Sequence, residues 1–543
     1  MFDTSYAPIF VICVVALIAH RLSKLGRRPA GYPPGPPTLP IIGNLHLMPK
    51  KQAHLQFQKW AEEYGPVYSL ILGTKVMIVL SSDQAIKDLL DKRSGIYSSR
   101  PEMYLGQIVS GGLRMLLMEY GDTWRMIRKI VHNNLNIKAA RTYVPYQDLE
   151  NKAMLVGFLE QPDLFVDHIR RYTNSLTTQM IFGFRTTSID DPKLKQLFHG
   201  FEKFSEVQGT QMAALLDLFP VLRALPDFAL PLRKYAKKLH EKESELYVGH
   251  WLRVKQAIKN GTARPCFCLD LVRAQDEQGF SDPLAGYVSG SLLEAGSDTT
   301  AAILVGFIQA MVLFPNVAKR AQEELDCVCG DRFPTVEDEP NLPYIRACVK
   351  ESMRWMPTVV MGVPHAVIRD DEYLGYTIPK GAGVMWNVWA IHMDPKRHSD
   401  PRRFDPARYA HDNQTAAEAA NNPDATKRDQ FIFGAGRRLC QGMHIAERSL
   451  FLAIARLLWG FDFHRARDAN DREVVPDAHD LTEGMFVLPK PFLARIVPRD
   501  QNKIVQVKAE WSKMQDLLDE DQQWKVLPEG LIWKEYKQAA KAP

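Results

Sequence analysis

Cysteine is scarce in this chain, and neither sign of charge dominates it. The 7 cysteines among 543 residues form an odd, scattered set, which does not fit a disulfide framework and favours a reducing compartment. Lysine and arginine number 68 against 63 acidic residues, so the net charge of +5 is too small to indicate a nucleic-acid partner. Internal repeats and low-complexity tracts are also absent from the sequence, which excludes solenoid and disordered proteins.

The composition that remains is that of a large globular protein. Hydrophobic residues make up 46% of the chain and charged residues 24%, so a sizeable core is expected. Two cysteine pairs, Cys266 with Cys268 and Cys327 with Cys329, have a single residue between the thiols. Zinc sites normally have two or more intervening residues, so we expect these thiols to be buried or half-buried structural groups.

The N-terminus carries a short apolar segment, residues 6–19, followed at once by the basic residues Arg21, Lys24, Arg27 and Arg28. A signal peptide would place its charges before the apolar run and a cleavage site after it, and neither is found. We therefore expect residues 1–28 to be an uncleaved, single-pass anchor in the endoplasmic reticulum membrane, with the remaining chain on the cytoplasmic side. The proline-rich residues 29–40 are expected to form a stiff, extended hinge.

Helical patterns dominate the rest of the chain, beside a few strand-like pieces. A hairpin is expected at residues 67–72 and 76–80, and further strands at 363–368 and 383–389. The longest predicted helix, capped by Asp282, covers residues 283–314 and spans roughly 48 Å at about 1.5 Å per residue. It is apolar nearly all round and must run through the centre of the protein. The charged residues 500–543 are expected to form an amphipathic tail outside the main core.

The stretch at residues 433–442 places a cysteine at the start of another predicted helix, residues 441–459. Its residues are Phe433, Gly434, Ala435, Gly436, Arg437, Arg438, Leu439, Cys440, Gln441 and Gly442. The glycines allow the backbone to turn tightly beside a flat ligand. The free N–H groups and the dipole of the helix start favour a thiolate at Cys440. A lone cysteine at a helix start is more often structural, so the interpretation depends on the complete stretch.

This stretch resembles the haem-binding loop of the cytochrome P450 family, which it matches at Phe433, Gly436, Arg438, Cys440 and Gly442. The resemblance implies that Cys440 is the axial thiolate ligand of the iron in haem b, iron protoporphyrin IX. It implies a mainly α fold, a triangular prism with a small β lobe, over residues 41–499. It also implies a monooxygenase that uses O2, a small substrate and electrons from NADPH through the flavoprotein NADPH-cytochrome P450 reductase.

Other family motifs occur in the expected order. Residues 295–300, a polar break in the long helix, are similar to the oxygen-activation motif, which implies that Asp298 and Thr299 serve the protons of the reaction. Taken alone, the same residues are better explained by a glycine kink whose polar groups bond the preceding turn. Trp124 and Arg128 are similar to a helix motif that contacts a haem propionate, and Arg438 is implied to pair with one. His365 is either a propionate donor or a satisfied core histidine.

Two family motifs have a structural role. Glu351 and Arg354 resemble the family's Glu-x-x-Arg pair, and Arg408 in residues 406–409 resembles the arginine that completes an ion triad with it. A surface salt bridge explains the three-residue spacing equally well. By family analogy, the side chains facing the substrate are mostly apolar: Ile108, Leu113, Met212, Leu215, Leu293, residues 359–361, Met485 and Phe486.

The sequence style resembles fungal hydroxylases of secondary metabolism, including those acting on small phenolic polyketides. An apolar phenolic or polyketide substrate is therefore expected. Two alternatives stay open: a haem-thiolate enzyme that rearranges or dehydrates its substrate without a reductase, and a non-enzymatic haem sensor or carrier.

Overall fold

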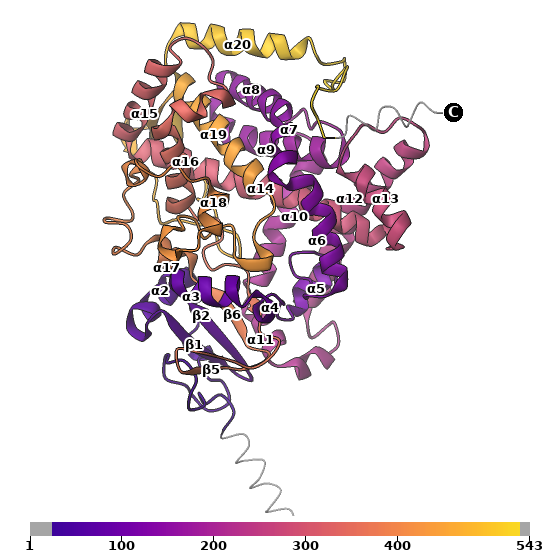
Figure 1. Cartoon of the computed structure of the whole chain (residues 1–543), viewed down its shortest axis with the longest axis vertical. Helices are drawn as coiled ribbons and strands as arrows, with labels where there is room; N and C mark the ends of the chain where they lie inside the picture. The colour runs from indigo at the N-terminus through magenta and orange to yellow at the C-terminus, as the bar shows by residue number, and fades with distance from the viewer. Residues whose placement is uncertain (1–23, 533–543) are drawn as a thin grey trace, which may run out of the picture.

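The helix α14 (Asp282–Leu313) runs through the middle of the protein, as Figure 1 shows. The computed structural model describes residues 24–532, so the apolar run of the expected anchor, residues 6–19, lies outside the described residues. Within residues 24–532, α14 is the one helix long and apolar enough to cross a membrane. Its most apolar window is 78% buried inside the protein, which identifies α14 as a core helix.

Local chemistry sets both ends of α14. The Ser281 hydroxyl accepts a hydrogen bond from the Leu284 N–H, and Pro283 occupies the first turn, where its missing N–H costs nothing. The expected cap, Asp282, is wrong by one residue, because its carboxylate accepts hydrogen bonds from Trp251 and Lys255 instead. The helix is continuous through residues 295–300 and ends before Pro315.

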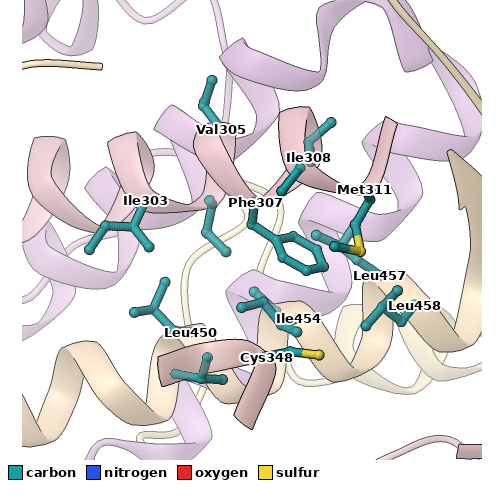
Figure 2. Close-up of a cluster of buried hydrophobic side chains, with 14 of the residues drawn as sticks. Ile303, Val305, Phe307, Ile308, Met311, Cys348, Leu450, Ile454, Leu457 and Leu458 are labelled. Atoms are coloured by element: carbon teal, nitrogen blue, oxygen red, sulfur yellow. The ribbon is translucent and has the colours of Figure 1, made fainter. Parts of the chain in front are cut away.

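The C-terminal half of α14 packs against α19 (Met443–Gly460) and α16 (Pro343–Trp355) to form the main core. Figure 2 shows Phe307 and Met311 of α14 directed at Ile454 and Leu457 of α19, with Cys348 of α16 beside them. All of these side chains are fully buried. Full burial of such side chains contributes about 1.5–3 kcal/mol each, so this packing fixes α19 against α14.

The remaining helices surround this core. The N-terminal half contains α2 (Ala53–Tyr64), α3 (Asp83–Ile86), the π-helix η3 (Lys87–Lys92), α4 (Ser94–Tyr97), α5 (Tyr104–Ser110), α6 (Asp122–Leu135), α7 (Ile137–Thr142), α8 (Val144–Glu160), α9 (Phe165–Phe182), α10 (Pro192–Gln208), α11 (Gln211–Leu218) and α12 (Pro231–Lys259). The C-terminal half adds α13 (Phe267–Gln278), α15 (Pro315–Val328), α17 (Val388–His392), α18 (Ala416–Asn421) and α20 (Gln501–Gln515). Short 3-10 turns include η5 (Pro220–Ala224), η7 (Pro406–Tyr409) and η9 (Gly436–Arg438).

A small β lobe lies at one end of the helical body (Figure 1). Its sheet has the order β1-β2-β6-β3, from β1 (Val67–Leu72), β2 (Lys75–Leu80), β6 (Gly383–Trp386) and β3 (His365–Ala366). Strands β1 and β2 are antiparallel, whereas β2 and β6 are parallel. Two smaller sheets comprise β4 (Asp371–Tyr373) with β5 (Tyr376–Ile378), and β7 (Phe461–Arg467) between β8 (Glu473–Val474) and β9 (Ala494–Pro498).

The predicted hairpin at residues 67–80 is confirmed, while the later strands are shorter than predicted. Only His365 and Ala366 of residues 363–368 form a strand. The segment 383–389 divides into β6 and α17, because the Asn387 side chain accepts the Ala390 N–H at 2.9 Å and starts a helix there.

The proline-rich segment is bound to β1. The Ser69 hydroxyl donates to the Pro33 carbonyl at 2.6 Å, and the Ser69 N–H donates to the Pro34 carbonyl at 2.7 Å. Arg28 also bonds Ser69 and the carbonyls of Gly35 and Pro36. Residues 28–36 are therefore part of the folded body and do not form a free hinge.

The expectation that the tail lies outside the main core is wrong for its described part. Val507 of α20 belongs to the main core, and Leu518 and Trp524 are buried in a second cluster. The Trp524 indole donates to Gln179 of α9 at 2.7 Å, and Lys152 of α8 pairs with a carboxylate of α20 at 2.9 Å. Figure 1 shows α20 lying along α8. Residues 500–531 thus form a strap, which we call the C-terminal strap, across α8 and α9.

Candidate haem site

Cys440 stands in the loop that leads into α19. Its N–H donates to the Phe433 carbonyl at 2.8 Å, which closes the loop on itself. Burial raises the pKa of the thiol, while the N–H groups of Gly442 and Met443 and the charge of Arg128 act to lower it. Met443 begins α19, so these donors are the free N–H groups of a helix start. The surroundings of the sulfur therefore supply what a thiolate needs.

Gly436 is required by the close approach of another segment. Its φ is +56°, and a Cβ at this position would lie 1.9 Å from the Leu90 carbonyl oxygen. The Gly436 N–H donates to Asp91 at 2.7 Å, which fixes the loop against η3. Phe433 is buried in the main core. Together these contacts hold the loop rigidly beside the start of α19.

Four basic groups meet beside this loop. Arg438 lies over the Trp124 ring of α6, 4.1 Å from its centroid, and Arg128 lies 5.7 Å from the same centroid. Burial, followed by the charge of Arg128, lowers the pKa of Arg438 to about 9. Burial also lowers the pKa of Arg128 to about 10. Arg100 is a third member, because its charge and that of Arg438 act on each other.

His365 is the fourth basic group of this cluster. Its Nδ1 lies 2.5 Å from the Tyr97 carbonyl oxygen, whereas its buried Nε2 has no hydrogen-bond partner among residues 24–532. Burial, followed by the charges of Arg100 and Arg438, lowers its pKa well below the ordinary value. His365 is thus not a fully satisfied core histidine.

The cluster fits a dianionic ligand edge such as the two propionates of haem. The three guanidiniums donate to backbone carbonyls, those of Leu116, Val363 and Pro364 for Arg100, Ser98 and Met118 for Arg438, and Leu439 for Arg128. No carboxylate in the described part of the chain pairs with any of the three. Buried positive charges without a counter-ion are costly, so this arrangement calls for anions.

The polar residues of α14 differ in their surroundings. The Thr299 hydroxyl donates to the Ala295 carbonyl at 2.7 Å, which is the back-bond to the preceding turn that the sequence alone favours. Ala295 is exposed and Thr299 half-buried, although both lie in the middle of a core helix. Burial raises the pKa of Asp298 to about 6, and Arg170 opposes this rise. A carboxyl with such a pKa exchanges protons readily near neutral pH.

The motif pair Glu351 and Arg354 forms a buried ion pair, so the surface salt bridge is wrong. Arg354 makes two bonds of 2.7 Å to the Glu351 carboxylate, and both side chains are fully buried. Arg408 approaches the same carboxylate at 3.4 Å. The triad ties α16 to η7 and supports the segment that leads to the Cys440 loop.

Comparison with known proteins agrees with this geometry. The family model described as Cytochrome P450 matches residues 33–492. The chain belongs to the cytochrome P450 family. It is 61% identical over 531 residues to cytochrome P450 monooxygenase virE of Hypocrea virens, covering 97% of this chain and 96% of that protein. It is also 57% identical over 533 residues to cytochrome P450 monooxygenase fogE of Aspergillus ruber, covering 97% and 99%, and 52% identical over 530 residues to cytochrome P450 monooxygenase fsoB of Humicola fuscoatra, covering 97% and 98%.

Family membership sets the chemistry. This P450 is a monooxygenase with the mainly helical P450 fold, and its cofactor is haem b bound through a cysteine thiolate. P450 monooxygenases use O2, a substrate and a redox partner.

Sequence reasoning missed Arg100. Its acceptors include the Val363 carbonyl, 263 residues away in the chain, so no local spacing marks it. Among the side chains expected to face the substrate, Leu293 is instead buried in the second core cluster. Met212 and Leu215 are exposed, whereas Ile108 and Phe486 pack against a cluster that includes Phe201 and Phe204.

Proposed function

We propose that Cys440 is the axial ligand of the haem iron. The observation that carries this proposal is the position of Cys440 just before the start of α19, where the N–H groups of Gly442 and Met443 act to lower the pKa of the thiol. Phe433 and Gly436 keep the loop rigid beside the ring. Among the 6 free cysteines of the described chain, Cys440 is the one in such a loop.

The propionates of the haem are held by the basic cluster in this proposal. Trp124 keeps Arg438 and Arg128 in place from α6, while Arg100 and the free Nε2 of His365 complete the site. Binding of two carboxylates neutralises buried charge that otherwise has no partner. Arg100 is an addition to the residues that the motifs suggested.

When bound, the haem activates O2 so that one oxygen atom enters a C–H bond of the substrate, with two electrons and two protons consumed. Asp298 takes up and releases the protons in this scheme, since its pKa of about 6 allows both. The Thr299 hydroxyl accepts a hydrogen bond from a water molecule while it donates to Ala295, and so holds that water beside Asp298.

The electrons come from NADPH through the reductase, which binds on the face where α6 and the Cys440 loop meet. Arg125, Lys129 and His132 are exposed on α6, and Arg437 is exposed on the loop. A basic surface attracts an acidic flavoprotein by electrostatic steering. The proposed substrate is a small apolar molecule, a phenolic or polyketide secondary metabolite, in keeping with the apolar character of Ile108, Val359 and Phe486.

The membrane side is the end that carries the β lobe. Val221 in η5 and Phe228 shortly after it expose 78% and 88% of their surface, and Ile41 exposes 43%. A hydrogen bond of 3.0 Å from Thr74 to the Leu218 carbonyl joins the β1–β2 turn to the end of α11, so these apolar residues share one end. We propose that this end rests on the endoplasmic reticulum membrane, with residues 1–28 as a single-pass anchor and the catalytic domain in the cytoplasm.

Two measurements test the function. Metabolites are compared in cells with and without the gene, and the compound that accumulates without it is incubated with microsomes holding the enzyme. NADPH and reductase should then both be needed for a product that is one oxygen atom heavier. Conversion without either would favour a rearranging or dehydrating enzyme, and haem binding without any conversion would favour a sensor or carrier.

A further inference from the structure

Three buried charged residues from three different segments, one of them α14, contact one another. Arg114, in the loop after α5, donates to Glu243 of α12 and to Glu294 of α14. The three side chains expose only 1%, 8% and 5% of their surface, and Arg114 also lies 4.1 Å from the ring centroid of Phe204. Two carboxylates share one guanidinium, so the cluster has one negative charge in excess if both are ionised.

The surroundings of the two carboxyls favour binding of one proton. Burial raises the pKa of both Glu243 and Glu294 above the ordinary value, although Arg114 acts to lower both. Burial acts to lower the pKa of Arg114, but the two carboxylates raise it, so the guanidinium stays charged. A single proton shared between the two carboxyls removes the excess charge without breaking either contact with Arg114.

The cluster also has free acceptor positions. Glu243 Oε1 and Glu294 Oε1 are buried and have no hydrogen-bond partner among residues 24–532. The other titratable groups around them are Tyr247 and Tyr287, whose hydroxyls interact with the two carboxyls. His240 follows at 2.9 Å from the Tyr287 hydroxyl. An unpartnered carboxyl oxygen is costly unless it is protonated or hydrated, so these oxygens mark places for a proton or a water.

Glu294 connects the cluster to Asp298, the proposed proton donor, along α14. Glu294 and Asp298 are four residues apart on one continuous helix, so they share a face with about 5–6 Å between their Cβ atoms. The charge of Glu294 contributes to the raised pKa of Asp298. One bridging water spans a gap of this size. Asp298 is followed directly by Thr299.

The outer end of the cluster reaches solvent. A cavity of about 330 Å³ between α10 and α12 is lined by Glu243 and Tyr247, together with the exposed Lys238 and Lys242. Water in this cavity therefore has access to Glu243. Titratable groups thus lie in succession from this cavity to the middle of α14, with a gap for one bridging water between Glu294 and Asp298.

We propose that Glu243 and Glu294, held together by Arg114, form the path by which protons travel from the cavity between α10 and α12 to Asp298. A proton from water in the cavity adds to the Glu243 carboxylate. Glu243 passes a proton through a water to the Tyr247 hydroxyl, which gives its own proton to Glu294, and Glu294 passes one through a second water to Asp298. Each step moves one proton and no electron. The inference rests on the proposed function, because the protons are consumed there.

The first test detects the protonation of the carboxyls directly and does not depend on turnover. In the resting holoenzyme near neutral pH, infrared spectroscopy should show the carbonyl band of a protonated, buried carboxyl that shifts in deuterated water. Glu294→Gln should remove or displace this band, and Glu243→Gln, a second variant, should do the same. Glu241→Gln, which changes an exposed carboxyl on the same helix α12, should leave the band unchanged. An unchanged band in both buried variants would overturn the proposal.

The second test measures how efficiently protons are delivered during turnover. Glutamine keeps the shape and a hydrogen bond to Arg114, so Glu294→Gln should retain the haem-thiolate spectrum while product per NADPH falls about threefold and the solvent deuterium isotope effect rises. A purely structural salt bridge would leave both quantities as in Glu241→Gln, which overturns the proton path. If the parent enzyme itself forms no product with reductase, the proposed function fails, whereas the infrared band still decides whether the cluster stores a proton.

Discussion

The guanidinium carbon of Arg438 lies 4.1 Å from the centre of the Trp124 ring. Arg438 stands two residues before Cys440, and Trp124 belongs to α6, more than three hundred residues earlier in the chain. The contact therefore joins the ligand loop to the helix that carries the exposed basic residues. In the proposed function, this one contact links electron delivery, propionate binding and thiolate ligation, and the variants that follow separate them.

Replacing Cys440 by serine should abolish haem-thiolate ligation. The reduced, carbon monoxide-bound enzyme should lose its strongly red-shifted Soret band, and turnover should vanish with it. Cys327→Ser is the matched control, because Cys327 is an exposed thiol outside the loop. Retention of the band in Cys440→Ser would assign the ligand to another residue.

Replacing Thr299 by alanine should uncouple the reaction. Alanine keeps the helix, since it is the best helix former, so haem binding and the carbon monoxide spectrum should persist. NADPH consumption should stay comparable, while product per NADPH falls about tenfold and hydrogen peroxide rises. Thr299→Ser retains a hydroxyl and should restore most of the coupling. A ratio unchanged from the parent enzyme would leave Thr299 as a helix residue alone.

Reversing the charge at Lys129 should impair reductase binding. We expect Lys129→Glu to slow reductase-driven turnover several-fold, with a larger loss at low salt, where screening is weakest. Peroxide-driven turnover needs no reductase and should be nearly unchanged. Lys51→Glu, an exposed lysine next to α2, is the control for net charge. Equal losses in both assays would indicate damage to folding or haem binding.

The carboxyl of Asp298 should make stability depend on pH. Burial raises its pKa from 3.8 to about 6, so the folded state holds a proton that the unfolded state releases. Stability is therefore lost as pH rises between about 4 and about 6, by up to about 3 kcal/mol. Asp298→Asn should match the parent below this window and unfold at a higher temperature above it. A difference between the two melting temperatures that is constant with pH would contradict this expectation.

The proposed orientation in the membrane predicts the absence of glycans. Asn260 and Asn413 begin the two glycosylation sequons, and both residues are exposed. A catalytic domain in the cytoplasm leaves both unmodified, so glycosidase treatment should not change the mobility of the native protein. A shift would place the domain in the lumen. Substituting glutamine at each asparagine identifies the modified position in that case.

Local signals made part of this structure predictable. Pro283 and Pro315 delimit α14 within a residue of its observed ends, and the glycines around Cys440 mark a tight turn before α19. Other features depend on contacts between distant segments. Tertiary packing brings Arg100 close enough to Arg438 of the Cys440 loop for their charges to interact, and no pattern in the sequence marks Arg100.

Buried polar clusters also depend on contacts between distant segments, so the sequence does not predict them. Arg114, Glu243 and Glu294 are far apart in sequence, and no spacing between them predicts that they meet. The sequence does not reveal the burial of the C-terminal strap, because its apolar residues, Leu518 and Trp524, are single side chains in a charged segment. Burial of isolated apolar residues depends on the groove they meet, and this groove is formed by α8 and α9.

The path of the C-terminal strap affects the order in which the protein is assembled. A ribosome releases α8 and α9 more than three hundred residues before Trp524, so Gln179 and Arg185 remain uncovered while the catalytic body folds. The strap can close over α8 and α9 only after the chain has been synthesised past Trp524. A premature stop codon near residue 500 would leave the haem loop intact but expose the apolar seat of Trp524, and such a chain is a substrate for chaperones and proteolysis.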